Sequence, residues 1–252
     1  FKIVILQLAH EFSPYILENL DYTIILIYGR VMAEIKKELK VMTERIDTPA
    51  FHRNYQYIVE VLISELKFNH GNILEIASGS GQHAMTFANT FPKITFWPSD
   101  LNSGHIRSIE AWKYDVTAGN LRSPFMLDVL EEDWGIGESD RPPDALDAII
   151  NINMVHISPI ETAKNLFKMS SKHLGDAGKL MLYGPFMRGG KHTSLSNADF
   201  HERLRASNPT WGLRDIEEVS AFANSNQLIL NRLVPMPANN FMLIFERSEQ
   251  SK

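Results

Sequence analysis

The stretch GNILEIASGSGQH, Gly71 to His83, decides how the rest of this sequence is interpreted. Its first half is a short apolar run, which predicts a buried β-strand over Asn72–Ile76, and its second half is rich in residues with small side chains. Because glycine lets the backbone approach a bound molecule closely, Gly79 and Gly81 predict a loop that binds a ligand. Glu75 lies just before that loop and adds a carboxyl group to the predicted site.

Strand-like and helix-like segments alternate along most of the chain. The further predicted strands are 94–100, 125–129, 145–155 and 178–186, followed by a pair within 228–247. The predicted helices are 51–66, 82–89, 105–116, 158–174 and 215–224. Ser158 is the predicted N-cap of its helix, with Pro159 at the first helical position. This order predicts an α/β fold with a mostly parallel seven-stranded sheet, helices on both faces and a C-terminal antiparallel hairpin.

Polar residues follow the predicted strands in order, and open α/β sheets bind ligands at the carboxyl ends of their strands. Asp100 ends the second strand, about 20 residues beyond the glycine loop, where a carboxylate can accept hydrogen bonds from two ribose hydroxyls. Asp128 is predicted to hold the edge of an adenine, and Asn151 and Asn153 to bind the amino end of the same ligand. Taken singly, each of these side chains could instead cap a turn or satisfy local backbone.

Two cofactors fit such a loop. GSGQHA is a loose match to the G-x-G-x-x-A fingerprint of dinucleotide-binding proteins, which is weak evidence for NAD by itself. Glu75 favours S-adenosylmethionine (SAM) instead, because a carboxylate suits a cationic cofactor and would repel a pyrophosphate. A C-terminal hairpin is also the ending of class I methyltransferases, so we expect SAM.

Seven segments carry a resemblance to a known family. They are TPAFHRNYQYIVEVL, ILEIASGSGQHAMTFA, FWPSDLN, IININMVHISP, YGPFMRGGKHTSLSNADF, NPTWGLRDIEEV and MPANNFMLIFER. In this order they resemble the family typified by methyltransferase-like protein twenty-six, over Asp47 to Arg247. The resemblance implies a Rossmann-like class I methyltransferase fold and SAM binding, with Ala77 where such enzymes usually have glycine. It implies little about the methyl acceptor.

The residues expected to act beyond the cofactor follow the later strands. His156 follows the fourth strand, beside the expected methyl group, and is the candidate general base; the alternative is a histidine bonded to backbone at a helix entry. Arg53 and Asn54 are predicted to fold over the cofactor, with Arg53 pairing with its carboxylate.

The acceptor site is predicted to involve four residues from later segments: Tyr183, Arg188, His192 and Arg214. A polar lid with positive charge would suit a small acidic acceptor, which we favour over RNA or protein. Trp211 is expected to pack rather than to stack on substrate. No basic stripe with interleaved aromatic residues occurs, so no nucleic acid partner is expected.

Composition sets the remaining expectations. The 252 residues have 44% hydrophobic content and a net charge of -5, and they include no cysteine, which excludes disulfides and thiolate metal sites. No metal site, membrane span or signal peptide is predicted, and a cytoplasmic location is expected. Residues 1–45 are interpreted as an N-terminal extension, helical or not native, and residues 46–252 as the methyltransferase domain. Two alternatives to catalysis of methyl transfer are a SAM-binding module that acts in a complex and a nicotinamide oxidoreductase.

Overall fold

The computed structural model describes residues 22–248, and the chain divides into two compact units, Phe1–Glu44 and Arg45–Lys252. Within the first unit, a single helix, α3 (Tyr22–Glu44), is described. Residues 22–44 of the predicted N-terminal extension are thus helical, while residues 1–21 of that extension lie outside the described residues. Across 22–248, no helix is both long enough and apolar enough to cross a membrane.

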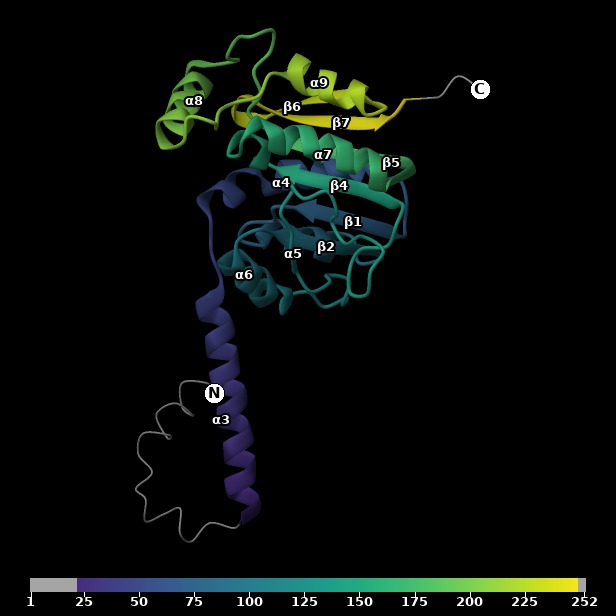
Figure 1. Cartoon of the computed structure of the whole chain (residues 1–252). Coiled ribbons are helices and arrows are strands. Elements are labelled where there is room, and N and C mark those ends of the chain that lie inside the picture. The colour runs from purple at the N-terminus through teal and green to yellow at the C-terminus, as the bar shows by residue number, and fades with distance from the viewer. Residues whose placement is uncertain (1–21, 249–252) are drawn as a thin grey trace. The chain divides into compact units, whose positions relative to one another are not determined.

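The second unit is built on one seven-stranded sheet with the order β3-β2-β1-β4-β5-β7-β6 (Figure 1). Strands β1 to β5 are parallel to one another, and β7 is antiparallel to both β5 and β6. The predicted fold class is therefore confirmed. The strands are β1 (Gly71–Ile76), β2 (Ile94–Asp100), β3 (Phe125–Met126), β4 (Leu146–Ile152), β5 (Leu174–Gly184), β6 (Leu228–Met236) and β7 (Asn240–Arg247).

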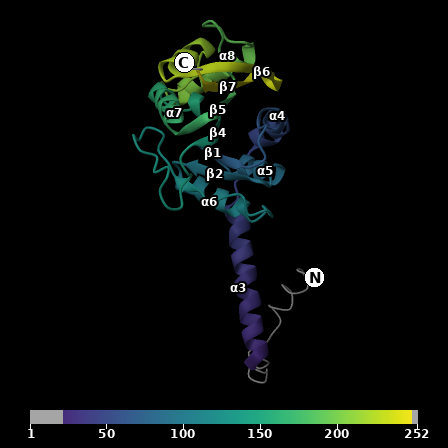
Figure 2. The ribbon, with the colours of Figure 1, turned by 90° about the vertical axis from the view of Figure 1, so that its right-hand side faces the viewer.

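Helices cover both faces of this sheet. Figure 2 shows α7 on one side of the strands and α4 and α5 on the other. The bounds are α4 (Pro49–Glu65), α5 (Gln82–Thr90), α6 (Ser103–Lys113), α7 (Ile160–His173), α8 (Leu195–Ser207) and α9 (Ile216–Ser225), with 3-10 turns η1 (Met154–His156) and η2 (Pro237–Asn239).

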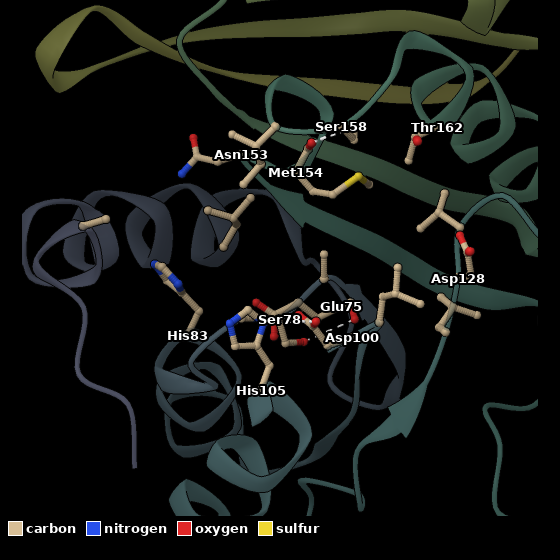
Figure 3. A pocket seen from close by; sticks show the side chains of 18 of the residues that line it. Glu75, Ser78, His83, Asp100, His105, Asp128, Asn153, Met154, Ser158 and Thr162 are labelled. Atoms are coloured by element: carbon tan, nitrogen blue, oxygen red, sulfur yellow. Dashed lines mark hydrogen bonds and ion pairs between the residues drawn. The ribbon is translucent and has the colours of Figure 1, made fainter. Parts of the chain in front are cut away.

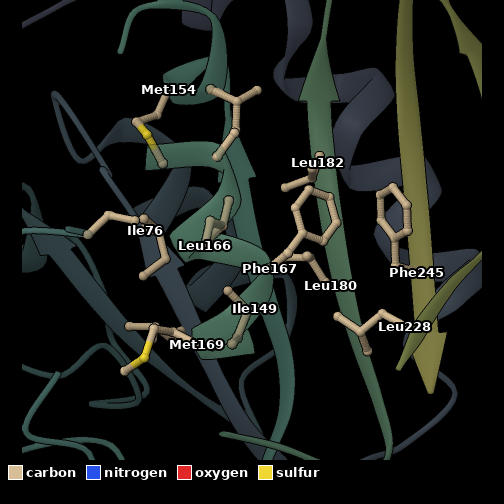
Figure 4. Close-up of a cluster of buried hydrophobic side chains, with 14 of the residues drawn as sticks. Ile76, Ile149, Met154, Leu166, Phe167, Met169, Leu180, Leu182, Leu228 and Phe245 are labelled. Atoms are coloured by element: carbon tan, nitrogen blue, oxygen red, sulfur yellow. The ribbon is translucent and has the colours of Figure 1, made fainter. Parts of the chain in front are cut away.

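The sheet is buried on both faces, which explains the near-continuous apolar runs of its central strands. On one face, the ring of Phe167 from α7 meets Phe245 of β7 edge to face, with centroids 5.0 Å apart, over Leu180 and Leu182 of β5 (Figure 4). On the other face, α4 and α5 pack their apolar sides against β1, β2 and β4. The core thus holds the carboxyl ends of β1, β2 and β4 at fixed positions.

Local structure departs from the sequence-based predictions at three places. β3 ends at Met126, so Asp128 lies in the loop after it. Ser158 is not the N-cap of α7, because its hydroxyl donates back to the carbonyl of Met154 and the helix begins at Ile160. Helix α8 was not predicted at all, and its only buried residues are Asn197 and Leu204, too few to give an apolar stripe.

Candidate functional site

A cavity of about 570 Å³ lies where β1, β2 and β4 end (Figure 3). The position is the one predicted for a ligand site in an open α/β sheet. Seven of the predicted cofactor residues line it: Asn54, Glu75, Ala77, Gly79, Asp100, Asp128 and Asn153.

The loop after β1 is folded so that backbone faces the cavity. Ala77 and Gly79 both have left-handed backbone conformations, with φ of 55° and 57°. A Cβ built on Gly79 would meet nothing within 4 Å, so the absence of a side chain leaves open space beside the backbone. Gly81 has a different role, because a Cβ there would lie 2.7 Å from Cα of Ile109 in α6. Gly81 is required for close packing of α5 and α6 and does not line the cavity.

Asp100 is held in place by three hydrogen bonds. Its Oδ2 accepts from the backbone N–H of Gly79 at 2.9 Å, and its Oδ1 accepts from the N–H of Asn102 at 2.8 Å. Nδ1 of His105 lies 3.0 Å from the same Oδ1. The carboxylate at the end of β2 therefore fixes the glycine loop at the end of β1, and it lines the cavity at the position expected for ribose recognition.

Glu75 is the most unusual group in the cavity wall. It is buried, and its Oε2 has no hydrogen-bond partner among residues 22–248. Burial raises the pKa of Glu75 to about 8. A hydrogen bond with Ser78 lowers this pKa by a smaller amount, and the nearby charge of Asp100 raises it further. An unpartnered buried carboxyl that lines a cavity is a group prepared for a hydrogen-bond donor or a cation.

The charge of the cavity wall is one-sided. Three lining residues are acidic, and none of the lining residues is a lysine or arginine. Two histidines, His83 and His105, also line it. Burial lowers the pKa of His83 to about 4, so this ring is uncharged at neutral pH.

The segment before α4 closes one side of the cavity. The backbone N–H and the hydroxyl of Thr48 donate to Oε1 of Gln82 at 2.9 and 3.0 Å, and Nε2 of Gln82 donates to Asp47 at 2.7 Å. Arg45 binds both carboxylate oxygens of Asp115. Thr48 lines the cavity as a result. Sequence reasoning missed these contacts, because partners more than 30 residues apart leave no local signal.

Asn151 does not line the cavity. It is fully buried in β4, and its Nδ2 donates to the carbonyl of Ile76 in β1 at 2.9 Å. The neighbouring Asn153 does line it, because a left-handed backbone conformation with φ of 67° interrupts the strand there. The two predicted residues are therefore separated by the end of β4: Asn151 bonds within the sheet, whereas the left-handed conformation of Asn153 turns it toward the cavity.

His156 is also placed behind the cavity wall, in the core. Its Nδ1 accepts from the backbone N–H of Arg214 at 3.2 Å, and its carbonyl accepts from the N–H of Gly212 at 2.9 Å. The ring packs edge to face against Phe186, and burial, with a smaller effect of Arg214, lowers the pKa of His156 to about 3. This arrangement matches the alternative interpretation, a histidine bonded to backbone at a helix entry, rather than a base that faces a ligand.

The predicted acceptor residues are not gathered at the cavity. Arg214 donates to the carbonyls of Val155, Ser158 and Thr210. Four other predicted residues lie outside the lining: Arg53 and Arg188 are exposed, Tyr183 is buried against Asn54, and His192 packs on His201.

Trp211, in contrast, lines the cavity, although packing alone was predicted for it. The turn at 208–212 brings Trp211 there, through the hydrogen bond from Gly212 to His156.

Residues 45–247 match the family described as "Protein of unknown function (DUF938)". The chain belongs to the DUF938 family. Its matched region begins at the residue where the second compact unit begins, Arg45, and ends at the last residue of β7.

The fold of this DUF938 protein is shared with solved methyltransferases. An O-methyltransferase family protein from Burkholderia thailandensis has a TM-score of 0.64 at 18% identity, over 79% of this chain and 57% of that one. CalO1, a methyltransferase in calicheamicin biosynthesis in its SAH-bound form, has a TM-score of 0.60 at 14% identity, over 75% of this chain and 52% of that one. A third solved structure with this fold, the PH0226 protein from Pyrococcus horikoshii OT3, has a TM-score of 0.60 at 11% identity, over 80% of this chain and 93% of that one. The DUF938 chain thus spans about half the length of the first two, and the likeness shows a common fold.

Proposed function

We propose that this DUF938 protein is a SAM-dependent methyltransferase that acts on a small molecule. The observation that carries the proposal is the cavity at the strand ends, with three acidic side chains, no lysine or arginine in its lining, and an unpartnered carboxyl oxygen on Glu75. SAM has a positively charged sulfur and an ammonium group; the carboxylates of Asp100 and Asp128 would attract these charges, and the unpartnered oxygen of Glu75 can accept a hydrogen bond from the ammonium group. The shared fold and the resemblance to the methyltransferase-like protein twenty-six family support the same proposal, of which a cytoplasmic location is part.

The residues in the wall fit the ribose, the adenine and the ammonium group of SAM. Asp100 would accept hydrogen bonds from the ribose hydroxyls, and the open backbone at Gly79 would lie against the cofactor. Asp128 uses Oδ1 to cap the turn at Leu130, which leaves its other oxygen to accept from an adenine amino group. Glu75 and Asn153 would bind the ammonium group. When bound, SAM would supply a methyl group that a nucleophile can take.

The same wall argues against NAD. A pyrophosphate carries two negative charges and is bound by backbone N–H groups, lysine or arginine. Here the N–H of Gly79 is already bonded to Asp100, and the acidic side chains would repel phosphate. The loose dinucleotide fingerprint in the loop is therefore not part of the proposal.

A SAM-binding module without catalysis is the second candidate. It is favoured by one observation: His156, the predicted base, does not line the cavity. Methyl transfer needs no base, however, when the acceptor atom is unprotonated at working pH. The similar structures, which include CalO1, a methyltransferase in calicheamicin biosynthesis, support an enzyme with a small acceptor.

The proposal can be tested with SAM labelled in its methyl group. The protein is incubated with labelled SAM and separate small-molecule, protein and RNA fractions of a cell extract, and label transfer is counted. We expect label in the small-molecule fraction, and far less with Asp100→Asn at limiting SAM. Label in the protein or RNA fraction would contradict the small acceptor. Binding of SAM with no transfer to any fraction would favour the non-catalytic module.

A further inference from the structure

His83, beside the cavity, has one ring nitrogen fixed by the protein. Its Nε2 lies 2.9 Å from Oδ1 of Asn54, and the side chain of Asn54 also hydrogen-bonds Tyr183. An amide oxygen only accepts, so Nε2 of His83 carries the proton and donates it to Asn54. The contact of Asn54 with Tyr183 helps to hold this amide in place. This chain of contacts leaves Nδ1 of His83 as the unprotonated nitrogen of a neutral ring.

Nδ1 of His83 has no partner within residues 22–248, although the side chain is only 9% exposed. His83 lines the cavity, and Figure 3 shows it at the same end as Asn153, away from Asp128. In the SAM orientation proposed above, Asp128 marks the adenine end and Asn153 the methionine end. A hydrogen-bond acceptor atom with no protein partner, on a residue that lines the methionine end of the cavity, lies where the methyl-accepting substrate would enter.

We propose that Asn54 and His83 form the recognition site for an uncharged hydroxyl or N–H group of the methyl acceptor, which donates a hydrogen bond to Nδ1 of His83. The inference rests on the proposed function, because it names the acceptor class for that same cavity. His83 contacts the acceptor, whereas Asn54 and Tyr183 are positioning residues that fix the ring.

The surroundings of His83 fit a neutral and largely apolar acceptor. Phe51 packs edge to face on the His83 ring, with centroids 5.0 Å apart, and both residues line the cavity. Met154, Ile157 and Trp211 add apolar surface to the lining. No lysine or arginine lines the cavity and the His83 ring is neutral, so the lining offers no positively charged side chain to a carboxylate on the acceptor. The small acidic acceptor predicted from Arg188 and Arg214 is therefore replaced by a neutral one.

Nuclear magnetic resonance can observe Nδ1 directly. Full-length protein labelled with ¹⁵N-histidine is saturated with S-adenosylhomocysteine (SAH), the demethylated product, so that the cofactor part of the cavity is filled. Phenol and benzoate are then titrated separately, because they have similar size and differ in charge. We expect phenol to shift the Nδ1 resonance of His83 in a saturable manner and benzoate to leave it unchanged.

Three variants separate the roles of the ring nitrogens. His83→Asn keeps an amide near the Nδ1 position and should retain phenol binding, whereas His83→Gln reaches toward Asn54 and should weaken it about 3- to 10-fold, the usual effect of one lost hydrogen bond. Both should bind SAH like the unchanged protein. His105→Asn is the matched control, because His105 lines the cavity beside Asp100. It should weaken SAH and leave the phenol response intact.

The outcomes distinguish the two proposals. Failure of SAH to bind the unchanged protein would overturn the proposed function and this inference with it. If SAH binds but phenol leaves Nδ1 unaffected, or benzoate binds in preference to phenol, the assignment of His83 is wrong while the proposed function stands. Equal phenol binding by His83→Gln and the unchanged protein would also overturn it.

Discussion

Replacing Asp100 by asparagine should weaken SAH binding without unfolding the protein. The asparagine can keep the bonds from Asn102 and His105 through its oxygen, while its amide nitrogen faces the N–H of Gly79, a donor facing a donor. The substitution therefore removes the negative charge and one loop contact, and preserves the size of the side chain. Asp100→Ala would leave all three donors without their partner and is the less informative variant.

The expected magnitude follows from the bonds that the carboxylate would make. A hydrogen bond to a charged group contributes about 1.5–3 kcal/mol, and SAH would lose such a contact from its ribose. This loss corresponds to about a 10- to 150-fold increase in Kd at 25 °C. Loosening of the loop at Gly79 should also lower the free energy of unfolding by about 1–2 kcal/mol.

Isothermal titration calorimetry with SAH measures the first effect, and thermal unfolding of the same samples shows that the variant is folded. Asp199→Asn is the control, because Asp199 is exposed on α8 and does not line the cavity. Its Kd should equal that of the unchanged protein. A Kd for Asp100→Asn within twofold of the unchanged value would refute the reasoning, since Asp100 would then only organise the loop.

Three further predictions address the rest of the chain. Deletion of 1–41 should leave cooperative thermal unfolding and the Kd for SAH unchanged, because the family match begins at residue 45; loss of cooperative unfolding would contradict this. His156→Ala should lower the free energy of unfolding by about 2–4 kcal/mol in urea titrations, since the ring is fully buried and holds the N–H of Arg214. A stable His156→Ala protein with turnover reduced about 10²–10⁴-fold would instead restore its role as a base. Because burial raises the pKa of Glu75 from 4.5 to about 8, the folded state holds one more proton than the unfolded state between those values, so stability should fall as pH rises, by at most about 1.4 kcal/mol per pH unit. Urea unfolding of Glu75→Gln should show a flatter dependence between pH 6 and pH 8, and identical slopes would count against the raised pKa.

The parts of the fold that follow from apolar periodicity could be predicted from the sequence. Strand–helix alternation and the terminal hairpin predict a mostly parallel sheet with helices on both faces and an antiparallel end, because parallel connections have few topologies. The carboxyl ends of the strands then bring Asp100 and Asp128 to one cavity. Helix α8 escaped prediction because its surface is polar nearly all round, so its position depends on contacts such as that of Asn197 with the carbonyl of Asn239.

The orientation of single side chains could not be predicted. After β4 the chain passes through a left-handed residue, Asn153, and then the 3-10 turn Met154–His156. The direction of the His156 side chain depends on the backbone conformation of these residues, which the sequence does not reveal. Arg214 was predicted to bind the methyl-accepting substrate. No local pattern in the sequence shows that its N–H groups donate instead to the backbone carbonyls of Val155 and Ser158, more than 50 residues earlier. His83 was part of the opening motif, but its role depends on Asn54, 29 residues earlier.

The central claim is that the cavity selects a cationic adenosine cofactor over a dinucleotide. Calorimetry of the full chain with SAM, SAH and NAD, each titrated under the same conditions, tests it most directly. We expect one SAM or SAH to bind per chain and NAD not to bind. Tight binding of NAD with no binding of SAM or SAH would show that the cavity is a dinucleotide site instead.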